Sequence, residues 1–300
     1  MGTERSGTTE LARILDCHLN PGRMTTLGAH GAGLAGLPRT APELASVVQG
    51  LLLHEHWAPA YGVTLFDQRR AGSQLRRVEE MIEHALRLDP HPLATARSLE
   101  RRLVGVCRHF AVLLVALLRA SGTPARARCG FGGYFTPGRW EDHWVCEVWH
   151  EADARWVLVD AQLDELQRTS LRIDFDALDV PRDRFLVAGA AWARCRSGDA
   201  NAADFGIFDL RGLWLVAGNV VRDAAALCGA EMLPWDVWGA MAGPQATLDD
   251  ASLAFVDRVA ELTREPDAGF DTLRALYEAD DRLRVPGVVF NALLGRPEAL

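Results

Sequence analysis

Hydrophobic residues recur with helical spacing over residues 105–122, which is the most apolar stretch of the chain. Gly122 and Pro124 follow it and end the pattern, so it predicts a buried helix. Cys107 lies in the first turn of that predicted helix. The apolar positions that carry the pattern are Val106, Phe110, Leu113, Leu114, Leu117 and Leu118.

Three segments with strand character follow the helix and are rich in Val, Trp, Phe and Tyr. They cover residues 125–135, 142–150 and 155–163. The short connection between the last two favours an antiparallel hairpin. Since side chains alternate along a strand, one register of that hairpin brings His143 and Asp160 side by side.

The flanking sequence predicts mainly helices. Thr40 and Glu43 form a capping box that opens a helix ending near residue 56. Amphipathic spacing predicts four more helices, over residues 73–88, 93–103, 249–263 and 270–283. Residues 181–245 hold four of the nine tryptophans and favour a walled pocket for something small and partly apolar.

Composition describes a globular protein of 300 residues, 49% hydrophobic and 24% charged. We expect a single domain over residues 1–300, with a core at about 72–165, an N-terminal extension over 1–71 and a C-terminal extension over 166–300. All 32 basic residues are arginine, and the net charge of −8 argues against nucleic acid as a partner.

The longest apolar run has nine residues, too short to cross a bilayer, so no membrane partner is expected. The first residues lack the basic flank and apolar run of a signal peptide, and the six cysteines form no CxxC pair. We therefore expect a cytoplasmic protein with reduced thiols. No spacing of metal ligands is apparent, so neither a metal nor another cofactor is expected.

Cys107 is the first candidate for chemistry, because a helix N-terminus favours the nucleophilic thiolate. The alternative is a small core residue, which is what most free cysteines are. His143 and Asp160 would supply a base and the carboxylate that orients it, at separations of 143 − 107 = 36 and 160 − 143 = 17 residues. Asp164 is the rival carboxylate, and Asp160 is preferred because it directly follows the hydrophobic strand. His109 points away from Cys107 around the helix and is a poor base.

The runs GVCRHFAVLLVALLRASGTPARARCGF, EDHWVCEVW and WVLVDAQLD resemble the core of the transglutaminase-like superfamily, a compact relative of the papain-like cysteine proteases. The resemblance implies an α+β fold, with a nucleophile helix packed on an antiparallel sheet and additional helices at both ends. It also implies Cys107 as nucleophile, His143 as base and Asp160 as the orienting residue. Trp57 would be the oxyanion donor, although a buried core tryptophan is the alternative.

The reaction implied is acyl transfer through a thioester. Water as the second nucleophile would make the protein an amidase or peptidase, and an amine would make it a transamidase or acyltransferase. A catalytically inactive binding protein on the same fold is a third hypothesis. We expect hydrolysis of a small-molecule or short-peptide substrate, with Arg108, Tyr134 and Trp144 as substrate-binding residues.

Overall fold

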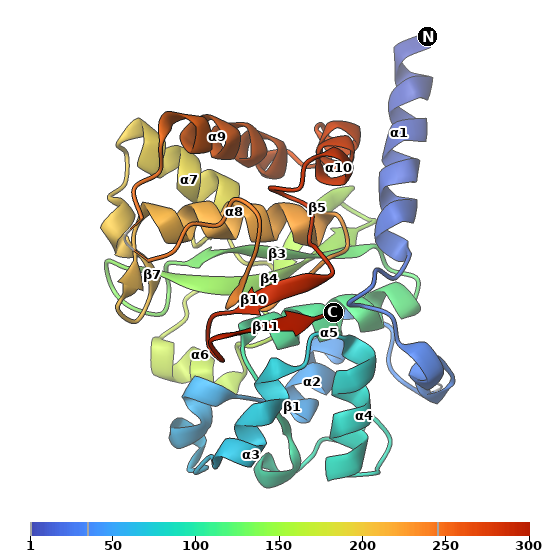
Figure 1. The fold of residues 1–300 in the computed structure, drawn as a ribbon. Helices are drawn as coiled ribbons and strands as arrows, with labels where there is room; N and C mark the ends of the chain where they lie inside the picture. Colours follow the sequence, from blue (N-terminus) through green and yellow to red (C-terminus); the bar gives the residue numbers. More distant parts are fainter. Residues whose placement is uncertain (1, 35, 245) are drawn as a thin grey trace. The chain divides into compact units, whose positions relative to one another are not determined.

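The computed structural model of the chain describes residues 2–34, 36–244 and 246–300 and has the predicted α+β fold (Figure 1). The chain folds into two units. The first unit comprises residues 1–127 and 145–180, and the second comprises residues 128–144 and 181–300. The chain thus passes between the units three times, at 127/128, 144/145 and 180/181. That residues 1–300 form a single domain stays a prediction.

The largest sheet has six strands in the order β6-β3-β4-β7-β8, with β5 paired to β4. Its three longest strands are β3 (Ala125–Gly132), β4 (Trp140–His150) and β5 (Arg155–Val159). β4 and β5 form the predicted antiparallel hairpin, in a register that runs from Cys146 opposite Val159 to His150 opposite Arg155. The hairpin prediction is therefore confirmed, while the pairing of His143 with Asp160 stays a prediction.

The first unit is built around α5 (Cys107–Ala120), the helix predicted from the apolar stretch. Every residue from Cys107 to Arg119 is buried, and the helix packs against α1, α2, α4, β1 and β2. The other helices and strands of this unit are α1 (Gly2–Leu19), η1 (Gly28–Leu34), α2 (Ala41–Leu51), β1 (Leu52–His54), η2 (Glu55–Tyr61), α3 (Asp67–Arg70), η3 (Ala71–Gln74), α4 (Val78–Leu88), η4 (Leu99–Arg101), β2 (Leu103–Gly105) and α6 (Glu165–Leu171).

Two predicted helices are wrong in part. The helix expected to reach residue 56 ends at Leu51, because residues 52–54 form β1 and pair in parallel with β2. The helix expected over 93–103 is absent; this segment holds η4 and the start of β2. Its backbone wraps around the buried guanidinium of Arg97, which donates to the carbonyls of Leu93 and Thr95, acceptors that a helix over 93–103 would use internally.

The second unit combines short strands with packed helices. Its elements are β6 (Phe185–Val187), α7 (Ala188–Ser197), η5 (Ala202–Asp204), β7 (Phe205–Ile207), β8 (Leu210–Arg211), α8 (Leu213–Leu227), β9 (Asp236–Val237), α9 (Asp250–Arg264), α10 (Phe270–Ala279), β10 (Val288–Asn291) and β11 (Arg296–Ala299). α7, α8 and α9 pack on one another (Figure 1). A Cβ at Gly189 would lie 2.5 Å from the Ala260 carbonyl oxygen, so glycine permits this close approach of α7 to α9. The helix predicted over 249–263 is α9, and it is capped by Asp249, whose side chain accepts from the Ser252 amide.

A buried ion pair joins α8 to β3 in this unit. Nε and Nη2 of Arg128 donate to the two carboxylate oxygens of Asp223, at 3.0 and 2.8 Å. The amide of Cys129 also donates to Asp223, and Arg128 donates to the carbonyl of Thr263. Together these contacts fix β3 against the helix.

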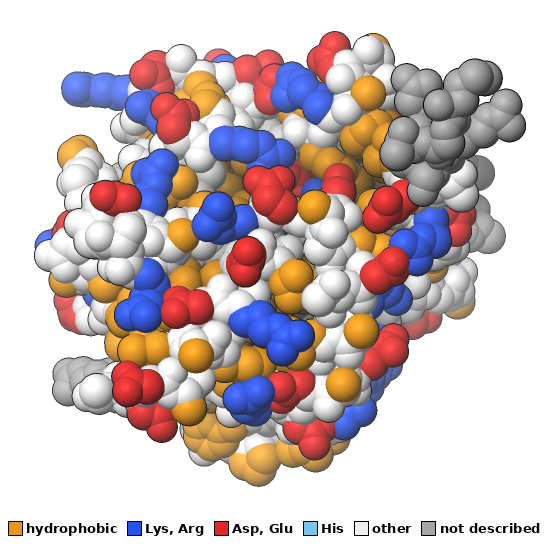
Figure 2. Space-filling model, turned by 90° about the horizontal axis from the view of Figure 1, so that it is seen from above, with side chains coloured by type: hydrophobic (Ala, Val, Ile, Leu, Met, Phe, Trp, Pro, Cys, Tyr) orange, Lys and Arg blue, Asp and Glu red, His pale blue; other side chains and the backbone are white. Residues whose placement is uncertain are grey.

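The face shown in Figure 2 has acidic and arginine side chains interspersed, with apolar side chains between them and no large area of one charge. Over residues 2–34, 36–244 and 246–300, no helix combines the length and the apolar character needed to cross a membrane.

Candidate active site

Cys107 is the first residue of α5 and its side chain is 8% exposed. The residue before it, Val106, is extended and donates its amide to Nδ1 of His109 at 3.2 Å. A Cβ at Gly105 would come within 2.9 Å of the His109 side chain, so glycine leaves room for this contact. The sulfur therefore sits at the N-terminal end of α5, where the positive end of the helix dipole favours a negative charge.

His109 caps the helix and does not serve as a base. Burial, followed by the nearby Arg108 charge, lowers the pKa of His109 from 6.5 to about 3. Since Nδ1 accepts the Val106 amide, the ring is neutral with its proton on Nε2. The expectation that His109 is unsuited to take the thiol proton agrees with these contacts.

Asp160 directly follows β5 and is 1% exposed. Its amide donates to the carbonyl of Ala177 at 2.8 Å, and its Oδ1 accepts from the Gln162 amide at 3.1 Å. The backbone on both sides of the carboxylate is therefore held by hydrogen bonds. Such a fixed carboxylate can orient an imidazole.

Asp164, the alternative carboxylate, stabilises the fold through hydrogen bonds from both of its oxygens. Its Oδ1 accepts from the Gln167 amide and caps α6, and its Oδ2 accepts from the Tyr61 hydroxyl at 2.5 Å. Burial and the hydrogen bond to Asp164 raise the pKa of Tyr61 above its usual value. Both oxygens of Asp164 are thus engaged by the fold of the first unit.

His143 lies on the part of β4 that belongs to the second unit and is 2% exposed. Three aromatic rings surround it, with centroid distances of 5.9 Å to Tyr134, 4.7 Å to Phe135 and 6.2 Å to Phe185. The edge-on contacts restrict rotation of the imidazole. Sequence reasoning missed Phe135 and Phe185, whose only signal is their aromatic character near a strand.

The remaining predicted site residues lie on separate elements of the fold. Arg108 is buried and donates to the carbonyls of Arg76 and Leu75, at 2.6 and 3.4 Å. Trp57 is half-buried in η2, and Trp144 is 1% exposed. Tyr134 contacts a predicted catalytic residue of its own unit, His143. The substrate roles of Arg108, Tyr134 and Trp144 and the oxyanion role of Trp57 stay predictions.

Cys107 and Asp160 belong to the first unit and His143 to the second. Their joint action therefore stays a prediction. Of the tryptophans predicted to wall a pocket, Trp192 and Trp238 are core residues, with indole N–H groups bonded to Asp257 and to the Leu283 carbonyl.

Residues 62–161 match the family model of the transglutaminase-like superfamily. Residues 62–161 form a transglutaminase-like segment. The resemblance expected at about 72–165 is thereby confirmed, and Cys107, His143 and Asp160 all lie inside the matched residues. Trp57 lies outside them.

Among solved structures, the chain is similar to one described as a "Putative Cysteine Protease" from Cytophaga hutchinsonii, with 17% identity and a TM-score of 0.33. The similarity covers 58% of this chain and 45% of that one, so it spans less than half of the other protein. A comparison with curated proteins gives no match.

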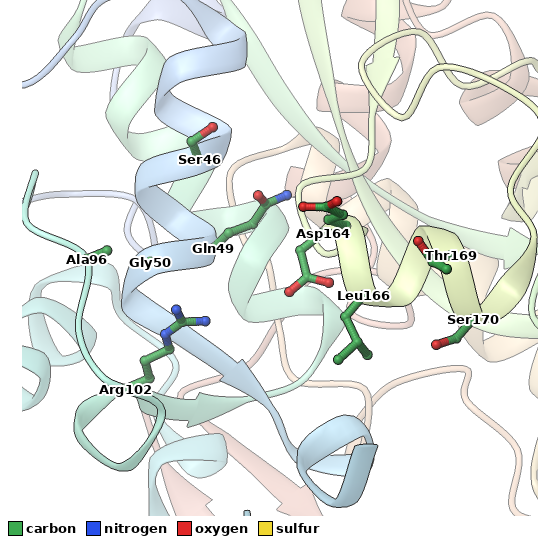
Figure 3. Close-up of a pocket in the computed structure, with 10 residues that line it drawn as sticks. Ser46, Gln49, Gly50, Ala96, Arg102, Asp164, Leu166, Thr169 and Ser170 are labelled. Atoms are coloured by element: carbon green, nitrogen blue, oxygen red, sulfur yellow. The ribbon is translucent and has the colours of Figure 1, made fainter. Parts of the chain in front are cut away.

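A groove of about 680 Å³ opens between α2 and α6, and the transglutaminase-like segment contributes Ala96 and Arg102 to its lining (Figure 3). Sequence reasoning missed it, because its residues come from three separate parts of the first unit. Among the described residues, no group of three or more His, Cys, Asp or Glu side chains could hold a metal ion. The groove is lined by Ser46, Gln49, Gly50, Ala96, Arg102, Asp164, Glu165, Leu166, Thr169 and Ser170.

Proposed function

We propose that the protein is a cysteine-dependent acyl-transfer enzyme that works through a thioester on Cys107. The observation that carries the proposal is the position of Cys107, at the first residue of the buried helix α5 and inside the transglutaminase-like segment. A thiol at a helix N-terminus is favoured as thiolate, and the positive end of the helix dipole can stabilise negative charge that develops on a bound carbonyl. The family match supports cysteine-dependent catalysis in general.

In the proposed reaction the Cys107 thiolate attacks the carbonyl carbon of an amide. The tetrahedral intermediate collapses as the carbon–nitrogen bond breaks, and His143 gives its proton to the departing amine. Water then attacks the thioester while His143 takes a proton from it. The carbon–sulfur bond breaks, and the acid and the free thiolate are released.

The register of β4 with β5 supports the roles of His143 and Asp160. The paired residues begin at Cys146 and Val159. Continued by one residue, this register sets Asp160 opposite Val145, which shares a face of β4 with His143, two residues away. Asp160 is also preferred because the alternative, Asp164, is engaged by Tyr61 and by the cap of α6.

We further propose a small-molecule or short-peptide substrate, and hydrolysis as the outcome. The absence of lysine from all 300 residues means that the chain offers no lysine amine of its own for crosslinking. A groove of about 680 Å³ is also within the range of small-ligand sites. Hydrolysis is favoured because water is present unless a lid excludes it.

Alanine variants test the assignment with a panel of short acylated peptides and small amides. Cys107→Ala and His143→Ala should each abolish turnover, because members of a catalytic unit do not act additively. Asp160→Asn should retain residual activity through a misoriented histidine. Cys228→Ala is the matched control and should be fully active, with circular dichroism checking every fold. Turnover that survives in Cys107→Ala would refute the proposed nucleophile.

Incubation with casein and a labelled amine tests the substrate class. We expect little incorporation of the amine, since a folded protein is not the proposed substrate. Efficient, saturable incorporation would instead show a protein-crosslinking transamidase.

A further inference from the structure

Arg102 presents an incompletely bonded guanidinium to the groove. It is half-buried, and its Nε donates to the carbonyl of Arg97 at 3.1 Å. Within the part of the chain that the structure describes, this is the guanidinium's only hydrogen bond, and no carboxylate lies within ion-pair distance of it. Burial lowers the pKa of Arg102, and the charge of Asp164 partly opposes that shift. Within the described residues, neither terminal nitrogen has a hydrogen bond, so both are open to solvent or to a ligand.

The opposite wall of the groove does not close on Arg102. Figure 3 shows Arg102 and Gln49 on one side and Asp164 and Leu166, at the start of α6, on the other. The Asp164 oxygens already accept from the Tyr61 hydroxyl and the Gln167 amide. The groove is therefore lined by one guanidinium, that of Arg102, whose two terminal nitrogens have no hydrogen bond among the described residues.

The groove also shares its wall with the segment that fixes Asp160. Nε2 of Gln49 donates to the carbonyl of Ala161 at 3.2 Å, the residue next to Asp160. Asp164, three residues further, lines the same groove. A ligand in the groove would thus lie against the loop that begins at the proposed orienting carboxylate.

We propose that this groove binds the carboxylate end of the substrate, the free C-terminus of a short peptide or the carboxylate of a small acid, through Arg102. This inference rests on the proposed function and names its substrate class. A guanidinium matches a carboxylate with two parallel hydrogen bonds. The nearby Asp164 and Glu165 repel any anion, but they repel a singly charged carboxylate less than a phosphate, which carries nearly two negative charges at neutral pH.

Paired peptides isolate the carboxylate. The affinities of trialanine and of trialanine amide are measured by titration calorimetry in the Cys107→Ala variant, which has no nucleophile. We expect trialanine to bind about tenfold more tightly than its amide, the effect of one hydrogen-bonded charged group. Arg102→Met should reduce this ratio to about one, and Arg102→Lys, which keeps the charge and loses the fork, should give an intermediate ratio.

The matched control is Arg101→Met. Arg101 is the neighbouring residue and is exposed, and it donates to the carbonyl of Leu88 outside the groove. It should leave the ratio unchanged, and thermal unfolding of each variant checks that the fold persists. Where turnover is measured in the active enzyme, Arg102→Met should raise KM for the free acid with little change in kcat.

Equal affinity for the two peptides, no binding of either, or a preference that persists in Arg102→Met would each overturn the inference. Because binding is measured without the nucleophile, these outcomes are separate from a failure of the proposed reaction. If trialanine binds more tightly than its amide but the wild type forms no acyl-enzyme, the proposed reaction is refuted and the carboxylate site is not.

Discussion

The buried pair of Arg128 and Asp223 sets the stability of the second unit around β3, the strand next to the one that carries His143. The two side chains are 1% and 0% exposed. Asp223→Ala would leave the Arg128 charge buried without its partner, a change that costs about 3–5 kcal/mol. Because whole domains are stable by about 5–15 kcal/mol, the loss is a large fraction of the total.

An exposed pair with the same chemistry is the control. Arg155 and Asp179 form two hydrogen bonds of 3.2 and 2.6 Å, but their side chains are 48% and 47% exposed. Asp179→Ala should cost far less than Asp223→Ala, since solvent screens surface pairs.

Urea unfolding followed by circular dichroism measures both variants. If Asp223→Ala does not fold, Asp223→Asn replaces it, since it removes the charge and keeps an oxygen for the Cys129 amide. The double variant Arg128→Leu with Asp223→Leu should be more stable than Asp223→Ala, because no unpaired charge stays buried. Equal losses for Asp223→Ala and Asp179→Ala would refute the reasoning that burial decides the effect.

Three further predictions follow from the described contacts. Iodoacetamide at limiting concentration should label Cys107 ahead of Cys146 and Cys195 in peptide mapping, because burial raises the pKa of both of these thiols, that of Cys195 to about 11; equal labelling would contradict this. His109, with its pKa lowered from 6.5 to about 3 in the folded protein, contributes stability that is present above pH 6.5 and lost as the pH falls toward 3. His109→Asn should therefore lose less stability than the wild type on acidification. An equal loss of unfolding free energy in both proteins, measured by urea unfolding at each pH, would disprove the assignment. EDTA should leave turnover unchanged. A loss of turnover in EDTA that an added metal restores would show a metal requirement.

The elements that the sequence predicted correctly are those whose pattern lies within a single segment of the chain. α5, the β4–β5 hairpin and α9 each follow from spacing or a short turn within one segment. Residues 52–54 were predicted as helix because their pairing partner, at residues 103–105, lies about fifty residues away. Parallel pairing of this kind leaves no local pattern.

The candidate site shows the same division. Cys107 was found from its place at the start of an apolar helix, but its neighbour His109 could be recognised as a cap only from the contact with Val106. The role of Asp164 depends on Tyr61, 103 residues earlier. The groove likewise combines Arg102 with residues of α2 and α6. Such long-range contacts are set by tertiary packing, which a single sequence does not display.

The thioester on Cys107 is tested most directly by intact-protein mass spectrometry. The protein is mixed with a panel of p-nitrophenyl esters and short acylated peptides, quenched with acid, and digested for peptide mapping. We expect a mass increase equal to the acyl group, located on Cys107, absent from Cys107→Ala and persisting in His143→Ala once an activated ester has loaded it. Turnover without any acyl adduct on Cys107, or an adduct on another residue, would contradict the account.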